Sequence, residues 1–423
     1  MRIAFIADWR SPTARNWVRM AAGMGHECLV LSSFPYQSAS YPTDSGIRVC
    51  QVPIALACLR RARRSPGLLS TQSQSTPAPH QFLPGRLRRT LGSASTWIAP
   101  YDLERHAKRA NRIFSTFSPD IVHVLRIPYE GMFATTLKIT SPLVVSVWGI
   151  DFTLIAPTTR KLRLLTRTTM RRADGLMADC HADVARALDW GLPPSRPTIV
   201  LPGGGGIDLG SLDRTPSRAD AKRALGIDPE RIVILNPRGD RQYIPTAVYC
   251  TALHQIATRR RDTFFVFADM ARNAEVARSL RQLGIAERTM LLPKLDHGRM
   301  IDLFAAADVS VSPSLHDGTP NSLLEAMAAG CLPVVGDIPS VREWIEPRVN
   351  GLVCNPLDPA DIANAVLSAI EDQDLARAAA TRNRALIQDR ASREHVAAAA
   401  DGYYRSLLRR PSKVKVGVER LPQ

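Results

Sequence analysis

The chain repeats one unit along most of its length, a short apolar, β-branched run followed by a stretch with helical periodicity. The first such unit comprises residues 3–7 and 14–24, and Gly25 ends its helix before the next apolar run at 28–32. Apolar and polar residues do not alternate within these runs, which is typical of parallel strands that are buried on both faces. The repeat therefore predicts an α/β fold with doubly wound parallel sheets.

The repeat falls into two series, which indicates two domains. Further strands are predicted at 121–125 and 143–147, and a second series begins after 199–201 and the glycine run 203–206. A length of 423 residues also favours two domains. We expect two Rossmann-like domains that face each other across a cleft, because open parallel sheets bind ligands beyond the carboxyl ends of their strands. The strands predicted in the second series are 232–236, 263–268, 290–292, 309–311 and 332–335.

The domain limits follow from this pattern. We predict an N-terminal domain over 1–207, a C-terminal domain over 208–392, a closing helix over 393–410 and a basic, disordered tail over 411–423. A basic loop at 55–115 interrupts the N-terminal series.

The net charge of +16 is concentrated in two places. Residues 55–115 contain eleven Lys and Arg against two acids, and residues 405–423 contain six against one. Leucines interspersed in the first segment favour contact with an anionic membrane surface, and a solvated charge run is the alternative. Nucleic acid is not expected as a partner, since aromatic and basic residues do not interleave and no binding motif is found.

The amino terminus and the cysteines exclude further classes of protein. The first apolar run is broken at Asp8, so it is too short for a signal peptide, and no later run approaches the roughly 18 apolar residues of a membrane span. The seven cysteines are scattered without a C-x-x-C pair, so neither a disulfide framework nor a metal site is expected. These features predict a cytoplasmic protein, free or held on the inner face of the cytoplasmic membrane.

The segment 312–335 carries the strongest chemical signal. A strand ends near Ser312, and a turn follows at Asp317. Thr319 is a suitable N-cap, and a proline after it suits the first helical position because its missing N–H would be unpaired there. The helix is expected to end at Gly330 and to lead into a buried strand.

Such a helix start is a candidate anion site. The N–H groups of Asn321 and Ser322 would point into the cleft and suit a diphosphate. Asp317 and Glu325 flank the site, and carboxylates suit sugar or ribose hydroxyls better than phosphate. An ordinary capped helix with a surface acid is the alternative.

The segment from Asp317 to Glu325 resembles the acid-x7-Glu motif of retaining GT-B glycosyltransferases, in particular the family 4-like group (group 1). Asp317 takes the first acid position, where the family more often has Glu. The resemblance covers about 1–30 and 118–370. Further similar segments are 25–28, 119–123, 147–151, 172–174, 202–208, 349–353 and 356–361.

The resemblance implies roles in a donor-binding C-terminal domain. Glu325 would hold the nucleotide ribose, and Asp317 would hold hydroxyls of the transferred sugar. Arg238 would bind phosphate, while the family's Lys is missing and Arg241 would supply a second cation or face solvent. Asp317, Glu325 and Arg238 form the predicted catalytic set. The predicted diphosphate-binding residues are Gly318, Thr319, Asn321 and Ser322.

The predicted acceptor side lies in the N-terminal domain. Arg10 follows the first strand, where it would reach donor phosphates, contact an anionic acceptor or anchor its own loop. Trp148 stands where many relatives have His, so Asp151 becomes the candidate polar contact to the sugar. His123 ends a strand and is a candidate for facing the acceptor, with a structural role as the alternative. His316, beside the first acid, is a further candidate.

The implied function is transfer of a sugar, with retention, from a nucleotide-sugar donor to a glycan, lipid-linked or small-molecule acceptor. The implied setting is cell-surface polysaccharide or glycoconjugate biosynthesis, with no cofactor and no metal. A GT-B nucleotide-sugar epimerase and a non-catalytic nucleotide-sugar or membrane-binding protein are the alternatives. A metal-dependent GT-A enzyme would need an Asp-x-Asp after a strand, but Asp372 and Asp374 are predicted to lie in a helical stretch.

Overall fold

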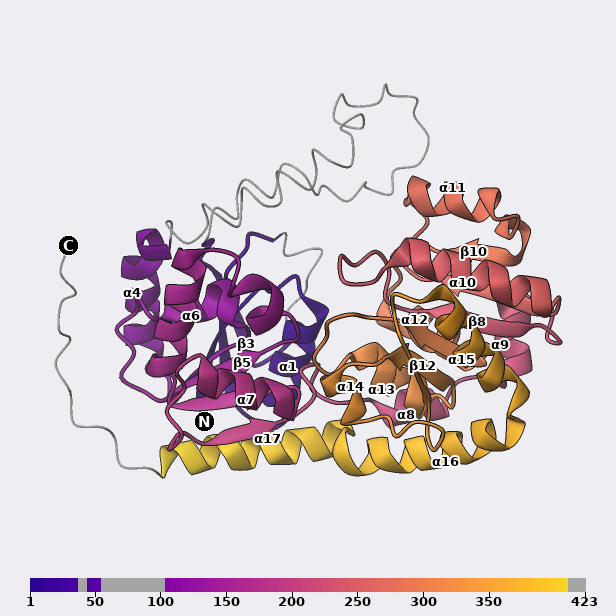
Figure 1. Cartoon of the computed structure of the whole chain (residues 1–423). Coiled ribbons are helices and arrows are strands. Elements are labelled where there is room, and N and C mark those ends of the chain that lie inside the picture. Colours follow the sequence, from indigo (N-terminus) through magenta and orange to yellow (C-terminus); the bar gives the residue numbers. More distant parts are fainter. Residues whose placement is uncertain (37–43, 55–102, 410–423) are drawn as a thin grey trace, which may run out of the picture.

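The computed structural model describes residues 1–36, 44–54 and 103–409, which form two α/β domains with one parallel sheet each (Figure 1). The prediction of two doubly wound domains is confirmed. Most of the basic loop and the tail, on which the predicted membrane contact and disorder rest, lie outside the described residues. Within the described ranges, no helix is both long enough and apolar enough to cross a bilayer.

The N-terminal sheet has seven parallel strands in the order β3-β2-β1-β4-β5-β6-β7. Its centre is apolar on both faces, and Ile3 in β1 pairs with Cys28 in β2 and Ile121 in β4. Strands β3 and β6 were not predicted. The strands are β1 Arg2–Ala7, β2 Glu27–Ser32, β3 Ile47–Gln51, β4 Ile121–Val124, β5 Leu143–Val147, β6 Gly175–Ala178 and β7 Thr198–Val200.

Helices cover both faces of this sheet. On one face, α1 (Pro12–Gly23) starts at the N-cap Ser11 and packs beside α17 (Arg393–Leu408). On the other face, turns and helices follow each strand from β3 to β6 and share a second core cluster. They are η4 Leu103–His106, α4 Ala107–Phe117, η5 Ile127–Gly131, α5 Met132–Ala134, η6 Asp151–Ile155, α6 Arg160–Arg172 and α7 His181–Asp189.

The C-terminal sheet has six parallel strands in the order β10-β9-β8-β11-β12-β13, of which β13 was not predicted. The strands are β8 Ile232–Asn236, β9 Thr263–Phe267, β10 Thr289–Leu291, β11 Val309–Ser312, β12 Leu332–Gly336 and β13 Leu352–Cys354. The helices and turns are α8 Leu209–Asp213, α9 Arg218–Ala224, α10 Thr246–Arg259, α11 Ala274–Gln282, η7 Ala286–Arg288, α12 His297–Ala306, α13 Asn321–Ala328, α14 Pro339–Arg342, α15 Pro359–Glu371 and α16 Gln373–Arg390.

The last helix, α17, packs against the N-terminal domain although it follows the C-terminal one. Helices α16 and α17 run under both domains in Figure 1. The chain crosses back where Ile207 pairs with Ser392. On α17, Tyr404 is fully buried and its hydroxyl accepts a hydrogen bond from Trp17 Nε1 at 3.1 Å. The predicted closing helix is therefore part of the N-terminal core.

Asp372 and Asp374 occupy a helix start. Asp372 is the N-cap of α16, where its carboxylate accepts from the N–H of Leu375 at 2.9 Å, and Asp374 pairs with Arg377. Asp374 thus lies in a helix as predicted, whereas Asp372 lies at the break between α15 and α16.

Candidate functional site

The two domains touch through residues that follow the carboxyl ends of their strands. Gly149 follows β5 and lies so close to the turn after β11 that a Cβ on it would be 3.2 Å from the Gly318 nitrogen and 3.5 Å from Asp317 Oδ1. Its φ of +51° also favours glycine. The predicted site segment therefore faces the other domain.

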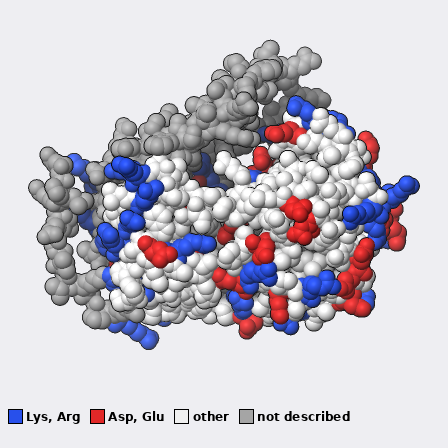
Figure 2. Space-filling model, viewed as in Figure 1, with Lys and Arg blue, Asp and Glu red and all other residues white. Residues whose placement is uncertain are grey.

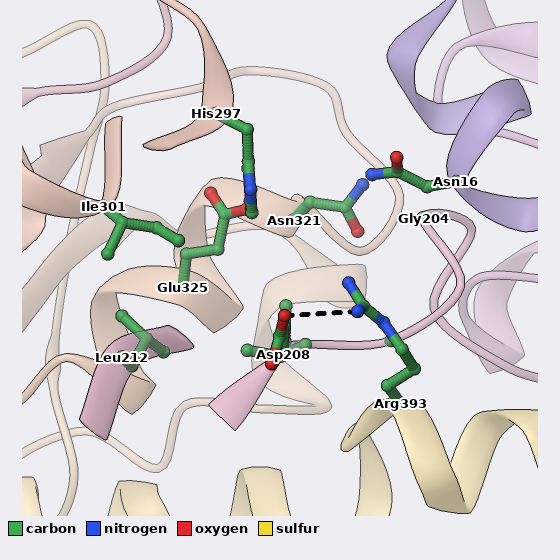
Figure 3. A pocket seen from close by; sticks show the side chains of 11 residues that line it. Asn16, Gly204, Asp208, Leu212, His297, Ile301, Asn321, Glu325 and Arg393 are labelled. Carbon is green, nitrogen blue, oxygen red and sulfur yellow. Dashed lines mark hydrogen bonds and ion pairs between the residues drawn. The ribbon is translucent and has the colours of Figure 1, made fainter. Parts of the chain in front are cut away.

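A pocket lies between the domains beside this contact (Figure 3). The side chains of Asn16 from α1 and Asn321 from α13 point toward one another across it. Gly204 passes against Asn321, since a Cβ at Gly204 would lie 2.5 Å from Asn321 Nδ2. The pocket is lined by Asn16, Gly204, Gly206, Ile207, Asp208, Leu212, His297, Ile301, Asn321, Glu325 and Arg393.

Helix α13 begins one residue later than predicted. Its N-cap is Pro320 and its first residue is Asn321, so the assignment of Thr319 as N-cap is wrong. The Thr319 hydroxyl instead donates to the backbone oxygen of Asp179 in the other domain and accepts from Trp344 Nε1 at 3.0 Å. The N–H groups of Asn321 and Ser322 still lie in the first turn, where the helix itself supplies no acceptor.

Arg238, after β8, lies at this helix start. Its Nη2 is 2.5 Å from Asp317 Oδ2 and 2.9 Å from the hydroxyl of Tyr243, and its Nη1 is 3.4 Å from Ser322 Oγ. Burial lowers the pKa of the guanidinium, but Asp317 and Tyr243 outweigh burial and leave it raised. Burial also raises the pKa of Asp317, and Arg238 opposes that rise. A cation and an acid are thus brought together at the predicted anion site.

Glu325 lies one turn further along α13 and has a partner that the sequence did not indicate. His297, the first residue of α12, places Nε2 2.9 Å from Glu325 Oε1. This hydrogen bond is the main cause that raises the pKa of His297. The Glu325 side chain is 18% exposed and lines the pocket, so it can reach a ligand there.

Two other predicted residues flank the turn after β11. Arg241 is exposed, and its charge contributes to lowering the pKa of Asp317 against the effect of burial. His316 is partly exposed beside Asp317.

Asp151 does not face the cleft. Its side chain is fully buried and accepts from Arg126 Nε at 2.8 Å and from the backbone N–H groups of Ile127 and Trp148. Trp148 lies against Gly203, where a Cβ would be 2.9 Å from its Nε1. The prediction that Asp151 contacts the sugar is corrected, because all of these contacts serve the turns after β4 and β5.

His123 is also a core residue. It is fully buried, with Nδ1 2.7 Å from the Tyr404 hydroxyl and Nε2 2.8 Å from Ser146 Oγ. Burial lowers its pKa to about 3. The structural alternative thus holds for His123, since neither ring nitrogen is left for an acceptor.

Arg10 is anchored within its own loop. Its Nε and Nη2 lie 2.9 and 2.8 Å from the two carboxylate oxygens of Asp8, and its guanidinium lies 4.3 Å from the centre of the Phe34 ring. These contacts agree with the anchoring alternative.

The structure adds Asp179, which follows β6, to the contact between the domains. It is 6% exposed and lies against Gly318, where a Cβ would clash with its carboxylate. Burial, followed by the charges of Asp183 and Asp317, raises its pKa well above the usual range. Among the described residues, Asp179, Cys180 and Asp183 bring three ligand atoms within 4.8 Å of one another, a spacing that could hold a metal ion.

Glu343, after α14, also joins the domains. Its two carboxylate oxygens accept from the N–H groups of His181 at 2.9 Å and Ala182 at 3.1 Å, so it caps α7 of the other domain. More than 160 residues separate the partners, and no local pattern in the sequence could have indicated the pair.

Glu130, in η5, is a buried acid at the same edge of the N-terminal sheet. It is 4% exposed, and Ser33 Oγ donates to its Oε1 at 2.5 Å. Burial raises its pKa to about 7, despite the bond from Ser33. Its position after β4 was not predicted, because it follows a strand end by six residues.

The chain has two parallel-sheet α/β domains, and a pocket lies between them at the carboxyl ends of their strands. This arrangement is the GT-B architecture. Family models agree, since "Glycosyl transferases group 1" matches residues 218–386 and "Glycosyl transferase 4-like domain" matches residues 11–203. The chain therefore belongs to the group 1, family 4-like glycosyltransferases of GT-B fold.

Individual relatives are distant. A D-inositol 3-phosphate glycosyltransferase of Geodermatophilus obscurus is 30% identical over 224 residues, which is 50% of this chain and 48% of the relative. A 2-deoxystreptamine glucosyltransferase of Streptomyces kanamyceticus is 22% identical over 68% of this chain and 70% of its own length. The chain spans about half the length of several curated relatives that it matches.

Solved structures share the fold over nearly the whole chain. A sucrose-phosphate synthase from Thermosynechococcus elongatus has a TM-score of 0.72 at 16% identity, covering 96% of this chain and 99% of that one. Anabaena HepE in complex with UDP-glucose has a TM-score of 0.72 at 15% identity, covering 96% and 100%. At these identities the similarity establishes the fold.

Proposed function

We propose that this protein is a retaining glycosyltransferase that moves a sugar from a nucleotide-sugar donor to a glycan, lipid-linked or small-molecule acceptor. The observation that carries the proposal is the start of α13, where Arg238, Asp317 and Ser322 meet and Glu325 lies one turn further on. The proposed setting is cytoplasmic biosynthesis of cell-surface polysaccharide or glycoconjugate.

Each group has a proposed task. The N–H groups of Asn321 and Ser322 and the guanidinium of Arg238 bind the diphosphate, and Glu325 accepts from the ribose hydroxyls. Asp317 binds hydroxyls of the transferred sugar. The bond between Arg238 and Asp317 lets a diphosphate compete with the carboxylate for the cation as the donor enters.

The proposed mechanism relies on electrostatic stabilisation. Breaking the anomeric bond places negative charge on the leaving diphosphate, and preorganised donors at that charge lower the barrier. An oxygen of the departing phosphate accepts the proton of the attacking acceptor hydroxyl. We propose that no metal takes part, because Arg238 and the helix start supply the positive potential.

Thermal melting against a panel of nucleoside diphosphates tests the donor site. The true product, at about 100 times its Kd, should stabilise the protein by about 2.7 kcal/mol. Glu325→Gln should reduce that shift while leaving the ligand-free melting temperature close to that of the wild type. A panel without any shift would contradict the proposal.

Turnover in excess EDTA tests metal independence, and the anomeric configuration of the product tests retention. We expect undiminished turnover with a retained anomer. Loss of turnover that Mg²⁺ or Mn²⁺ restores in the wild type but not in Asp183→Asn would locate a metal at the cluster around Asp179. Conversion of donor without acceptor would instead indicate an epimerase.

A further inference from the structure

Helix α6 exposes a stripe of arginines around one leucine. The α6 stripe consists of Arg160, Arg163, Leu164, Arg167 and Arg171, all exposed. The four arginines are spaced three or four residues apart, as one face of a helix requires, and Leu164 lies beside Arg163. The opposite face is buried through Leu162, Thr166, Thr169 and Met170. The helix contains no acidic residue, so all the charges on its outer face are positive.

The surroundings extend this positive face. Lys108, Arg109 and Arg112 on α4 are exposed, as is Lys138 between the two helices. None of these cations, and none in the α6 stripe, pairs with an acid among the described residues. Figure 2 shows Lys and Arg gathered on the domain that carries α4 and α6, with few acids among them.

Two acids lie close to the α6 stripe in the described part of the chain. Asp174, after α6, is partly buried and lies 3.4 Å from Arg196 and 4.0 Å from Arg172. Asp189, at the end of α7, is exposed at the rim of the face. Among the described residues beside the stripe, one exposed acid therefore faces four arginines.

Large exposed apolar side chains occur on the same face. Leu164 is 54% exposed within the stripe, Leu154 in η6 is 36% exposed and Leu188 in α7 is 44% exposed. Arg167 lies over the Trp190 ring at 5.9 Å, which places the end of α7 beside α6. Cations that surround exposed leucines suit a surface that is both anionic and apolar.

We propose that the α6 stripe, with Leu154 and Leu188, binds the surface of an anionic lipid bilayer. Headgroup phosphates would pair with the arginines, and the leucines would enter the acyl boundary. A soluble polyanion would satisfy the arginines but leave the leucines in water. The α6 stripe itself lies outside the basic loop (55–115) and the tail, whereas Lys108, Arg109 and Arg112 beside it belong to the described end of that loop. Binding through the stripe does not depend on catalysis.

The orientation has a consequence that rests on the proposed function. Helix α6 starts just after η6, and η6 starts at Asp151 behind the turn that touches Gly318. Docking through α6 therefore leaves the cleft open beside the bilayer, where a lipid-linked acceptor would enter without leaving the membrane.

Vesicle sedimentation tests the proposal with the full chain. Vesicles of phosphatidylcholine with and without phosphatidylglycerol are compared for the wild type and for the variant with Arg160, Arg163, Arg167 and Arg171 all replaced by Gln. Each cation near an anionic surface strengthens membrane partitioning about fivefold. We therefore expect the variant, which lacks four cations, to bind anionic vesicles at least about 10²-fold more weakly. The matched control replaces Arg261, Arg272, Arg278 and Arg281, which are exposed on the other domain and equal in charge.

The control should bind like the wild type, and Leu164→Gln should weaken vesicle binding without changing binding to heparin. Equal loss in the control, or unchanged binding by the α6 variant, would overturn the proposal. Loss of heparin binding that matches loss of vesicle binding, with no effect of Leu164→Gln, would assign the face to soluble polyanions. The melting shift with a nucleoside diphosphate should persist in every variant, which confirms folding and separates this test from that of the donor site.

Discussion

The carboxyl edges of the two sheets use their polar residues differently. At the C-terminal sheet, one short segment at the start of α13 presents backbone N–H groups, Asp317 and Glu325 toward the other domain. At the N-terminal sheet, Asp151 and His123 are fully buried, and each bonds to its own partners: Asp151 to Arg126, and His123 to Ser146 and Tyr404. The first edge thus groups its polar residues at the domain contact, whereas at the second edge Asp151 and His123 bond within their own domain.

Arg238→Gln should give the largest effect and test the first half of this comparison. Removing a preorganised cation from the leaving group should lower kcat/KM about 10³-fold. Steady-state kinetics with the identified donor measure it. Arg126→Gln, at the other edge, is the matched control, and we expect it to lower stability with little change in donor KM. A similar loss of kcat/KM in both variants would contradict the difference between the edges.

Glu130→Gln tests whether Glu130, at the edge of the N-terminal sheet, is protonated in the folded protein near neutral pH. With a pKa near 7 in the folded protein and 4.5 as the usual value, wild-type Glu130 holds its proton longer in the folded state. Its contribution to stability is present below pH 4.5 and is lost as pH rises to about 7, by about 3 kcal/mol in all. The variant should therefore melt at a higher temperature than the wild type at pH 8, and the difference should vanish near pH 4. Parallel melting curves across this range would refute the assignment.

His123→Ala should act on stability alone. It removes two buried hydrogen bonds and leaves a cavity beside Tyr404, for a loss of about 3 kcal/mol. Chemical denaturation measures this, and acceptor KM should stay unchanged. A variant with a raised acceptor KM and normal stability would indicate that His123 contacts the acceptor.

Glu343→Gln should give the smallest effect. It keeps the shape but removes the charge that caps α7 across the domain contact, and we expect a roughly fivefold loss of kcat/KM from a weakened closed arrangement. Small-angle scattering with bound product should show a larger radius of gyration than in the wild type. Unchanged kinetics and scattering would show that the contact does not set domain closure.

The geometry at the start of α13 could be predicted because its residues lie close together in sequence, whereas their role in binding stays a prediction. The turn, the helix start and both acids lie within the nine residues from Asp317 to Glu325. Helix geometry therefore fixes the directions of the N–H groups and the Glu325 side chain. The strands were predictable for the same reason, since continuous apolar runs such as Ile232–Asn236 mark buried parallel strands. Three strands were not predicted because none forms a continuous apolar run of usual strand length: β3 contains Arg48 and Gln51, β6 begins with Gly175, and β13 has three residues.

The domain contact could not be predicted because it joins residues that are far apart in sequence. The Thr319 hydroxyl is used by Asp179, 140 residues away, and this contact overrides its local suitability as an N-cap. The sequence could not decide between an acceptor-facing and a structural role for His123, nor show that Asp151 is buried, for a related reason. A strand end marks the edge of a sheet, but whether a side chain there turns outward depends on distant partners such as Arg126 and Tyr404.

The placement of α17 bears on how the molecule assembles during synthesis. The core beside Trp17 is completed by Tyr404, so the first domain lacks one wall of its interior until residues 393–408 have left the ribosome. The second domain, which needs no later segment for its sheet, would be formed by then. We therefore expect the amino-terminal half to mature last, and a fragment ending at residue 207 to expose the apolar face of α1 and aggregate.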